Sequence, residues 1–198
     1  MKKSGSKAAA LQMGALPPIA GLDRLTAERH GAILCGNDFT VSCGVTMNGA
    51  KLILALLDEG YEKKTWHGPN LKQSLKGVTA KQAAWRPGPG RHNIWEVALH
   101  AAYWKYTVRR RIEGGKRGSF ILKGHNFFPR PEKGKATEAA WNADKELLER
   151  EHRAMCAAIA KSLRKPRDAK FLRQLYGVAF HDVYHAGQIR LLRRLQER

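Results

Sequence analysis

Two histidines near the C-terminus have the spacing of a metal site. His181 and His185 lie in the segment 180–189, where apolar residues recur with a helical period. Residues i and i+4 share one face of a helix, with Cβ atoms about 6 Å apart, so both imidazoles can bind one ion. Because Val178 and Ile189 lie on the same side, we expect the pair to face the interior. The alternative is a pair of core or interface histidines bonded to side chains or water.

A third histidine, His100, could complete such a site. It lies within the largely apolar segment 95–104, and an antiparallel bundle can place its helix opposite the helix of His181 and His185. Three imidazoles leave one to three coordination positions open for water or substrate, which is typical of catalytic metal sites. Zn²⁺, Ni²⁺ and Fe²⁺ each accept three imidazoles, and the residues do not choose among them.

Three further residues are candidates for supporting the metal or lining its cavity. Gln188 follows His185 by three positions and could orient its imidazole or a bound water, but a glutamine that packs between helices is the interpretation we prefer. Glu96 precedes His100 by four positions and could accept its other N–H, but helix capping is the interpretation we prefer. His67 could accept a proton in the same cavity, or serve as a loop or capping residue.

Other polar residues near these positions are interpreted as structural. Tyr184 is expected to pack and Asp182 to lie at the surface or at a helix contact, because both point to other faces than the paired histidines. His92 precedes a helix cap and is expected to be structural. His152 could line the cavity, but we prefer a partly exposed position. Cys156 fits a small core residue better than a nucleophile.

The elements that must position these residues can be located from apolar periodicity and capping residues. The clearest helix begins at Asn93, has Glu96 three residues later, and ends before Gly114. A long loop over 116–136 follows it. The expected helices span 52–60, a piece after Pro69, 93–113, 137–162 and 168 to the C-terminus. Antiparallel packing of four such helices predicts an all-α, up-down four-helix bundle.

The chain has 198 residues, of which 43% are hydrophobic, and this is enough for one domain with a core. Residues 1–46 keep no regular period and are expected to form an irregular or disordered extension before a bundle over 47–198. A secretory signal is a weaker interpretation of the extension, and Met47 is an alternative natural start. The sequence has no apolar run of about 18–20 residues, which a membrane span would need, and its cysteines lack paired spacing. We therefore expect a cytoplasmic protein with no membrane association.

The formal net charge of +19 permits binding to anions. Basic residues gather at 109–111, 161–167 and 190–194, where some complement the dipoles of helix C-termini. These clusters could attract an anionic thiol cofactor, a phosphate or nucleic acid. The sequence contains no helix-turn-helix, ribonucleoprotein motif or zinc finger, so nucleic acid is the least favoured partner.

Residues from about 48 to 195 resemble the DinB/YfiT-like superfamily, which is related to bacterial thiol S-transferases. The matching segments are Trp66–Pro69, 92–96 with its continuation to His100, and 181–189. The segment 181–189 is the most specific, and Trp66–Pro69 marks a subgroup. The resemblance implies an often dimeric four-helix bundle that holds a divalent metal on His100, His181 and His185. The DNA polymerase that shares the DinB name is a different protein, and nothing in this short chain resembles it.

The residues predict an open metal site, and the resemblance predicts how it is used. We expect a metal-dependent enzyme that activates a thiol or water and presents it to an electrophile, as a thiol S-transferase-like or hydrolase-like protein. Its partners would be a small-molecule substrate or low-molecular-weight thiol and a second copy of the chain. The alternatives are a non-catalytic metal-binding stress-response protein and a basic nucleic-acid-associated protein.

Overall fold

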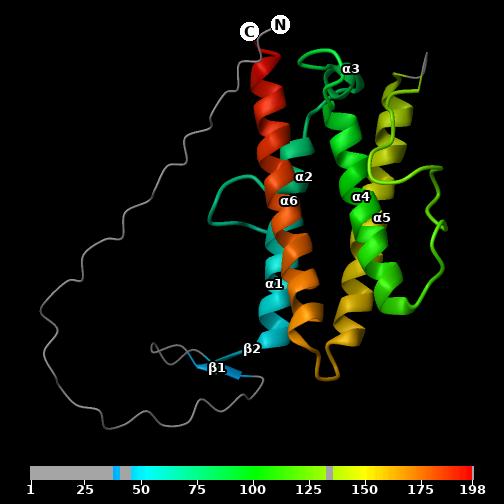
Figure 1. Ribbon diagram of the computed structural model, residues 1–198. Coiled ribbons are helices and arrows are strands. Elements are labelled where there is room, and N and C mark those ends of the chain that lie inside the picture. The colour runs from blue at the N-terminus through cyan, green and yellow to red at the C-terminus, as the bar shows by residue number, and fades with distance from the viewer. Residues whose placement is uncertain (1–37, 41–45, 133–135, 198) are drawn as a thin grey trace, which may run out of the picture. The chain divides into compact units, whose positions relative to one another are not determined.

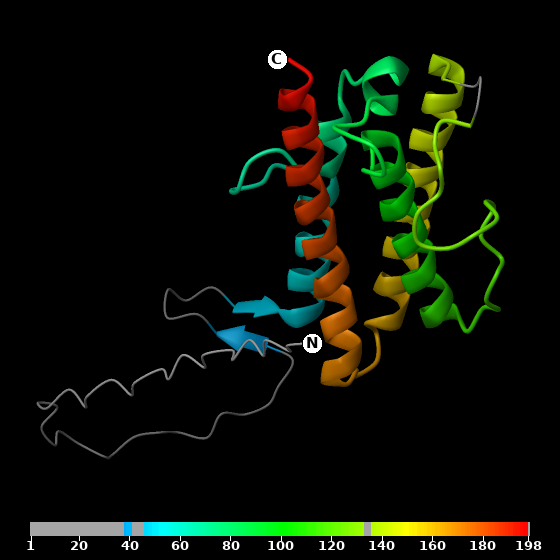
Figure 2. The ribbon, with the colours of Figure 1, turned by 45° about the horizontal axis from the view of Figure 1, so that its top comes forward.

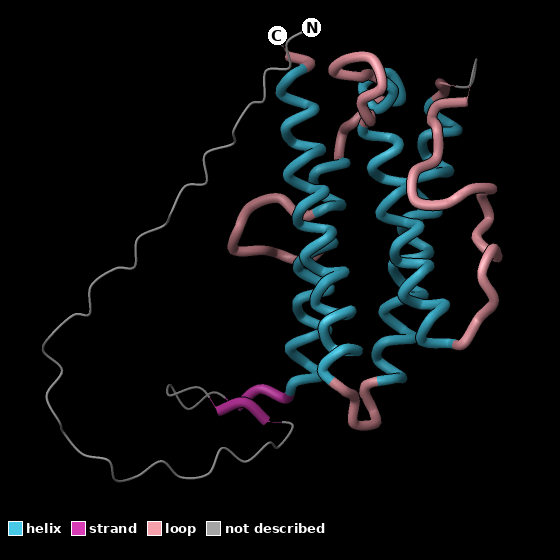
Figure 3. Tube along the Cα trace, in the orientation of Figure 1, coloured by secondary structure: helices cyan, strands magenta, loops and turns pink. Residues whose placement is uncertain are grey.

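The computed structural model describes residues 38–40, 46–132 and 136–197 (Figures 1 and 3). All the described elements belong to one compact unit, Gly36–Arg198. In chain order they are β1 (Asp38–Thr40), β2 (Thr46–Asn48), α1 (Gly49–Tyr61), α2 (Leu71–Leu75), α3 (Ala80–Ala84), α4 (Ile94–Glu113), α5 (Glu138–Ser162) and α6 (Ala169–Leu195).

The long helices α1, α4, α5 and α6 run alongside one another (Figure 2). Helix α4 packs against α5 and α6, while α1 packs against α6 and α5. The short helix α2 contacts α1 and α6, and α3 contacts α4 and α5. The two helices that contain the paired histidines and His100, α6 and α4, are therefore direct neighbours.

Side-chain caps determine where three of the long helices begin. Asn93, Thr137 and Asp168 each accept a hydrogen bond from the backbone N–H three residues later, at the starts of α4, α5 and α6. Each bond satisfies an N–H group that a helix start leaves unpaired. Helix α4 ends at Gly114 with φ of 71°, a left-handed conformation that glycine adopts without a Cβ clash. The predicted starts of these helices are confirmed.

The apolar core has two parts. The first contains Trp95 and Trp141 and joins α4 to α5 and to the short helices. The second contains Leu57, Met155 and Leu175 and lies between α1, α5 and α6. All five side chains are almost fully buried, and each such burial stabilises the fold by about 1.5–3 kcal/mol. The polar groups described below lie within or beside this core.

The all-α class is confirmed, but the described residues form six helices, where the sequence pattern predicted five helical segments with four of them packed as a bundle. The helical piece expected after Pro69 is two short helices, because Asn70 and Thr79 each open a separate capping box. The two strands pair antiparallel before α1, at the predicted boundary between extension and bundle. Most of 1–46 lies outside the described residues. None of the helices in the described ranges is both long and apolar enough to cross a membrane.

Candidate metal centre

Helices α4 and α6 bring three imidazoles together. His181 Nε2 lies 3.0 Å from His100 Nε2 and 3.0 Å from His185 Nε2. Two nitrogens bound to one metal at about 2.0–2.1 Å are about 2.9–3.4 Å apart for bond angles of about 90–110°. The separations therefore fit adjacent ligands on a single ion. His185 is buried, His100 is 7% exposed, and His181 is half-buried.

Hydrogen bonds made by the other ring nitrogens determine where the protons lie. His100 Nδ1 donates to the carbonyl oxygen of Asn126 at 2.9 Å, and His185 Nδ1 donates to Gln188 Oε1 at 2.6 Å. A neutral imidazole has one ring proton, so the Nε2 atoms of His100 and His185 present lone pairs. His181 Nε2 can donate to only one of them, and a metal ion is the partner that satisfies all three.

Burial keeps all three imidazoles neutral. His181 Nδ1 is buried and has no hydrogen-bond partner among the described residues. Burial, with the neighbouring histidines, lowers the pKa of His181 to about 3, and burial lowers the pKa of His185 to about 4. Burial also lowers the pKa of His100. The rings are therefore neutral near pH 7, which is the form that binds metals.

The three histidines line a cavity of about 670 Å³. Its walls come from α4, α6 and the loop that follows α4, and most of them are apolar: Val97, Trp104, Phe127, Leu191 and Leu192. Ligand sites commonly combine such apolar walls with a few convergent polar groups. A metal on the histidines would therefore face a space large enough for a small molecule.

The loop wall is held in place by an aromatic stack and an unusual backbone conformation. The Phe127 ring lies between two imidazoles, with centroids 4.1 Å from His100 and 3.7 Å from His92. Asn126 has φ of 66°, in the left-handed region that Asn tolerates better than most residues. This conformation accompanies the contact of its carbonyl with His100, while its side chain accepts a hydrogen bond from Trp104 Nε1 at 3.1 Å.

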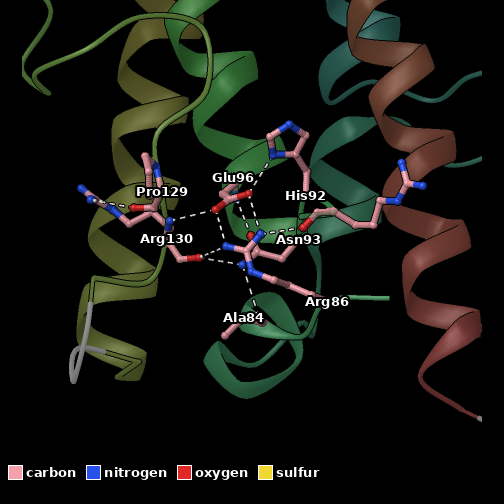
Figure 4. A network of polar contacts seen from close by, with 8 residues as sticks. Ala84, Arg86, His92, Asn93, Glu96, Pro129 and Arg130 are labelled. Carbon is pink, nitrogen blue, oxygen red and sulfur yellow. Dashed lines mark hydrogen bonds and ion pairs between the residues drawn. The ribbon is translucent and has the colours of Figure 1, made fainter. Parts of the chain in front are cut away.

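Glu96 holds the same loop through a network of polar contacts (Figure 4). Its carboxylate accepts hydrogen bonds from Arg86, from His92 Nδ1 at 2.8 Å and from the backbone N–H of Arg130 at 3.1 Å. Burial alone would raise the pKa of Glu96, but the bonds from Arg86 and His92 lower it. Its backbone N–H donates to the Asn93 cap. Glu96 therefore holds two loops together. It makes no hydrogen bond to His100, although the alternative role as a support for the metal ligand would require one.

Gln188 has the contact expected of a residue that orients an imidazole. It accepts from His185 through Oε1, and its Nε2 donates to the Tyr184 hydroxyl at 2.9 Å. Tyr184 is 62% exposed and lines the cavity, so the expectation that it packs is wrong. The reason is that position 184 lies on the outer face of α6, next to the cavity mouth.

Two other histidines lie away from the cavity. His67 is exposed and lines a separate groove with Arg190 and Arg194, because its loop crosses another face of α6. His152 is 2% exposed and stacks on Tyr61 with centroids 3.7 Å apart. The preferred expectation of a partly exposed His152 is therefore wrong.

A buried ion pair, which sequence patterns did not identify, lies beside the three histidines. Lys105 on α4 donates to Asp182 on α6, and both side chains are essentially inaccessible to solvent. Asp182 is therefore a helix contact and not a surface residue. Breaking a buried pair is strongly destabilising, so it fixes the register of the two helices that bear the ligands. The available signal was a charged residue next to His181 on a helix with apolar neighbours.

One comparison with known proteins identifies the family of the chain. A family model described as the DinB superfamily matches residues 65–189. The match includes His100, His181 and His185 and covers more than half of the chain. A search of curated proteins gave no match, and a search of solved structures also gave none.

Proposed function

Since the chain belongs to the DinB superfamily, we propose that it is a metal-dependent enzyme. His100, His181 and His185 would hold one divalent transition metal, Zn²⁺, Ni²⁺ or Fe²⁺. The substrates would be a low-molecular-weight thiol or water, as the nucleophile, and a small electrophile. Transfer of the thiol or hydrolysis would follow.

One observation carries the proposal: three imidazole Nε2 atoms meet at the wall of a cavity of about 670 Å³. The histidines could hold a metal ion, and three protein ligands leave positions for water or substrate. A divalent ion bound there would lower the pKa of a thiol or water toward neutrality and so supply a nucleophile. The cavity gives an electrophile a place beside it.

The chain's own residues would orient the ligands and shape the space. Asn126 and Gln188 hold two of the imidazoles through Nδ1, as partners of metal-binding histidines commonly do. The apolar side chains of Trp104 and Phe127 would limit access of bulk water to the nucleophile.

A homodimer would use the outer face of α6. Tyr176, Phe180 and Tyr184 follow at intervals of four residues, and Leu191 continues the row; their exposed fractions range from 37% to 62%. Such a contiguous apolar row is typical of interaction surfaces. Light scattering should give a dimer mass for the wild type and a monomer mass for Phe180→Glu. A monomeric wild type would reject this assembly.

The first test of the enzyme proposal is metal content. Tag-free protein would be incubated with Zn²⁺, Ni²⁺ or Fe²⁺ separately, dialysed, and measured by elemental analysis. His185→Ala should bind one equivalent less per chain than the wild type. His67→Ala is the matched control, because it removes an exposed imidazole from a separate groove, and it should bind as much as the wild type.

The second test is turnover of the loaded protein with simple thiols and an alkylating electrophile. Wild-type activity that is lost in His185→Ala would support the enzyme. Metal bound without turnover would favour the non-catalytic metal-binding alternative. Equal metal content with and without His185 would reject the three-histidine site itself.

A further inference from the structure

A second group of potential metal ligands lies where α1 meets α5. It consists of Asp58 on α1 and of His152 and Cys156 on α5, and one ligand atom of each lies within 4.8 Å of the others. We propose that these residues form a second metal site, separate from the three histidines, and that its ion is Zn²⁺. One carboxylate oxygen, one imidazole nitrogen and one thiolate sulfur are all ligands that zinc accepts.

The spacing on α5 already matches one edge of a zinc site. His152 and Cys156 are four residues apart on one helical face, and His152 Nε2 lies 3.5 Å from Cys156 Sγ. With a Zn–N bond of about 2.0–2.1 Å and a Zn–S bond of about 2.3 Å, a tetrahedral ion holds these atoms about 3.5 Å apart. A carboxylate oxygen of Asp58 lies within 4.8 Å of both atoms and would be the third ligand.

The Tyr61 ring orients His152, while His152 Nδ1 and the Asp58 carboxylate lack hydrogen-bond partners among the described residues. The imidazole stacks on the Tyr61 ring at 3.7 Å, and Tyr61 lies on the same face of α1 as Asp58, three residues away. His152 is 2% exposed, and its Nδ1 has no hydrogen-bond partner among the described residues. Within that same part of the chain, the Asp58 carboxylate makes no hydrogen bond or ion pair. An ion held by His152 Nε2 and Cys156 Sγ would give the Asp58 carboxylate a partner, whereas His152 Nδ1 would keep its proton.

The charges also balance. A divalent cation with one thiolate and one carboxylate forms a neutral unit, which can be buried at lower cost than a net charge. The buried ammonium of Lys105 nearby is paired with Asp182, so it does not leave a free positive charge to repel the ion. The Cys156 thiol would lose its proton when the ion binds.

The position of the second site between α1 and α5 determines how an ion reaches it and how binding affects stability. Asp58 and Cys156 are half-buried, so an ion can reach the site from solvent. Three protein ligands leave a fourth position for water. The bound ion would join α1 to α5 and would stabilise the folded state according to its concentration and affinity.

Co²⁺ is the probe for this site, because a thiolate bound to cobalt gives a near-ultraviolet charge-transfer band that an all-histidine site lacks. The experiment uses the full chain with Cys35→Ser and Cys43→Ser, so that Cys156 is its remaining cysteine. The band should appear on titration with Co²⁺ and persist when His185→Ala removes the other site. It should disappear in Cys156→Ser, and Zn²⁺ should displace it.

Two measurements keep the outcome decisive. Far-ultraviolet circular dichroism should show the same helix content in Cys156→Ser and its parent, so that loss of the band reports loss of a ligand. Asp58→Asn should keep the band but require more Co²⁺ to reach half-saturation. Absence of the band in the parent overturns the second site, and unchanged half-saturation in Asp58→Asn overturns the assignment of Asp58.

Discussion

The two ligand clusters are built alike but are placed differently. In each, one helix presents two ligands four residues apart and a neighbouring helix presents a third: α6 with α4 for the three histidines, and α5 with α1 for Asp58, His152 and Cys156. The first cluster opens onto a cavity of about 670 Å³, whereas the second is packed against the Tyr61 ring. Spacing on helices can capture an ion in both places, but only adjoining space for a substrate makes such a site suitable for catalysis.

The largest expected effect comes from the ion pair between the clusters. Lys105 Nζ lies 5.0 Å from the Tyr61 ring centroid, and its partner Asp182 adjoins His181. Asp182→Ala leaves a buried ammonium without its counter-charge, so the free energy of unfolding should fall by about 3–5 kcal/mol. Urea denaturation measures the loss.

The control for this prediction removes both charges. Lys105→Met with Asp182→Leu leaves no unpaired charge, so it should be much closer to the wild type than Asp182→Ala. If the double variant is as unstable as Asp182→Ala, the effect is due to packing and not to charge.

The next largest expected effect is the dependence of stability on pH that His152 causes. Burial lowers the pKa of His152 to about 3, against about 6.5 in the unfolded chain. Between these pH values the unfolded chain binds a proton that the folded chain does not. The free energy of unfolding should therefore fall as pH drops from about 6.5 toward 3, by up to about 1.4 kcal/mol per pH unit from this group.

His152→Phe tests this contribution, because it keeps a ring against Tyr61 but cannot titrate. With a chelator present, its stability should depend less steeply on pH than that of the wild type in the same window. The pKa shifts of His181 and His185 act in the same direction in both proteins, so the difference between the two slopes reports His152. Parallel slopes would contradict the prediction.

Gln188→Ala should weaken the cavity site alone. It removes the acceptor of the His185 Nδ1 proton, and loss of such a partner typically costs tenfold to a hundredfold in metal affinity. Competition with a chelator of known affinity measures the change. The cobalt–thiolate band of the second site should titrate as before, and a shift in both sites would show that the substitution acts through the fold.

The smallest expected effect is at the loop wall. Phe127→Ala removes the ring between His92 and His100, and aromatic stacking of this kind contributes about 0.5–1.5 kcal/mol beyond area burial. Thermal unfolding should show a modest decrease in midpoint. Trp66→Ala, which removes a ring that is 98% exposed, should have less effect; equal losses would mean that the stack does not stabilise the loop.

Local patterns were sufficient for the starts of α4, α5 and α6 and for the spacing of His181 and His185, because caps and helical period depend on nearby residues. They could not show the contact with His100, which needed antiparallel packing and a family resemblance. Asn126 and Phe127 could not be found, since a loop conformation depends on distant partners. Lys105 was also missed: α4 is buried on most sides over its first fifteen residues, so its pattern does not distinguish an inward from an outward face.

Asn126 and Phe127 belong to the loop after α4, whereas the three histidines belong to helices. In the proposed enzyme, the metal ligands would therefore come from helices alone, whereas part of the cavity wall would come from this loop. A loop of another length or composition could reshape that wall without changing any proposed metal ligand, provided that it keeps a carbonyl aimed at His100. Exchange of this one segment would then be a route to new substrates on an unchanged metal centre.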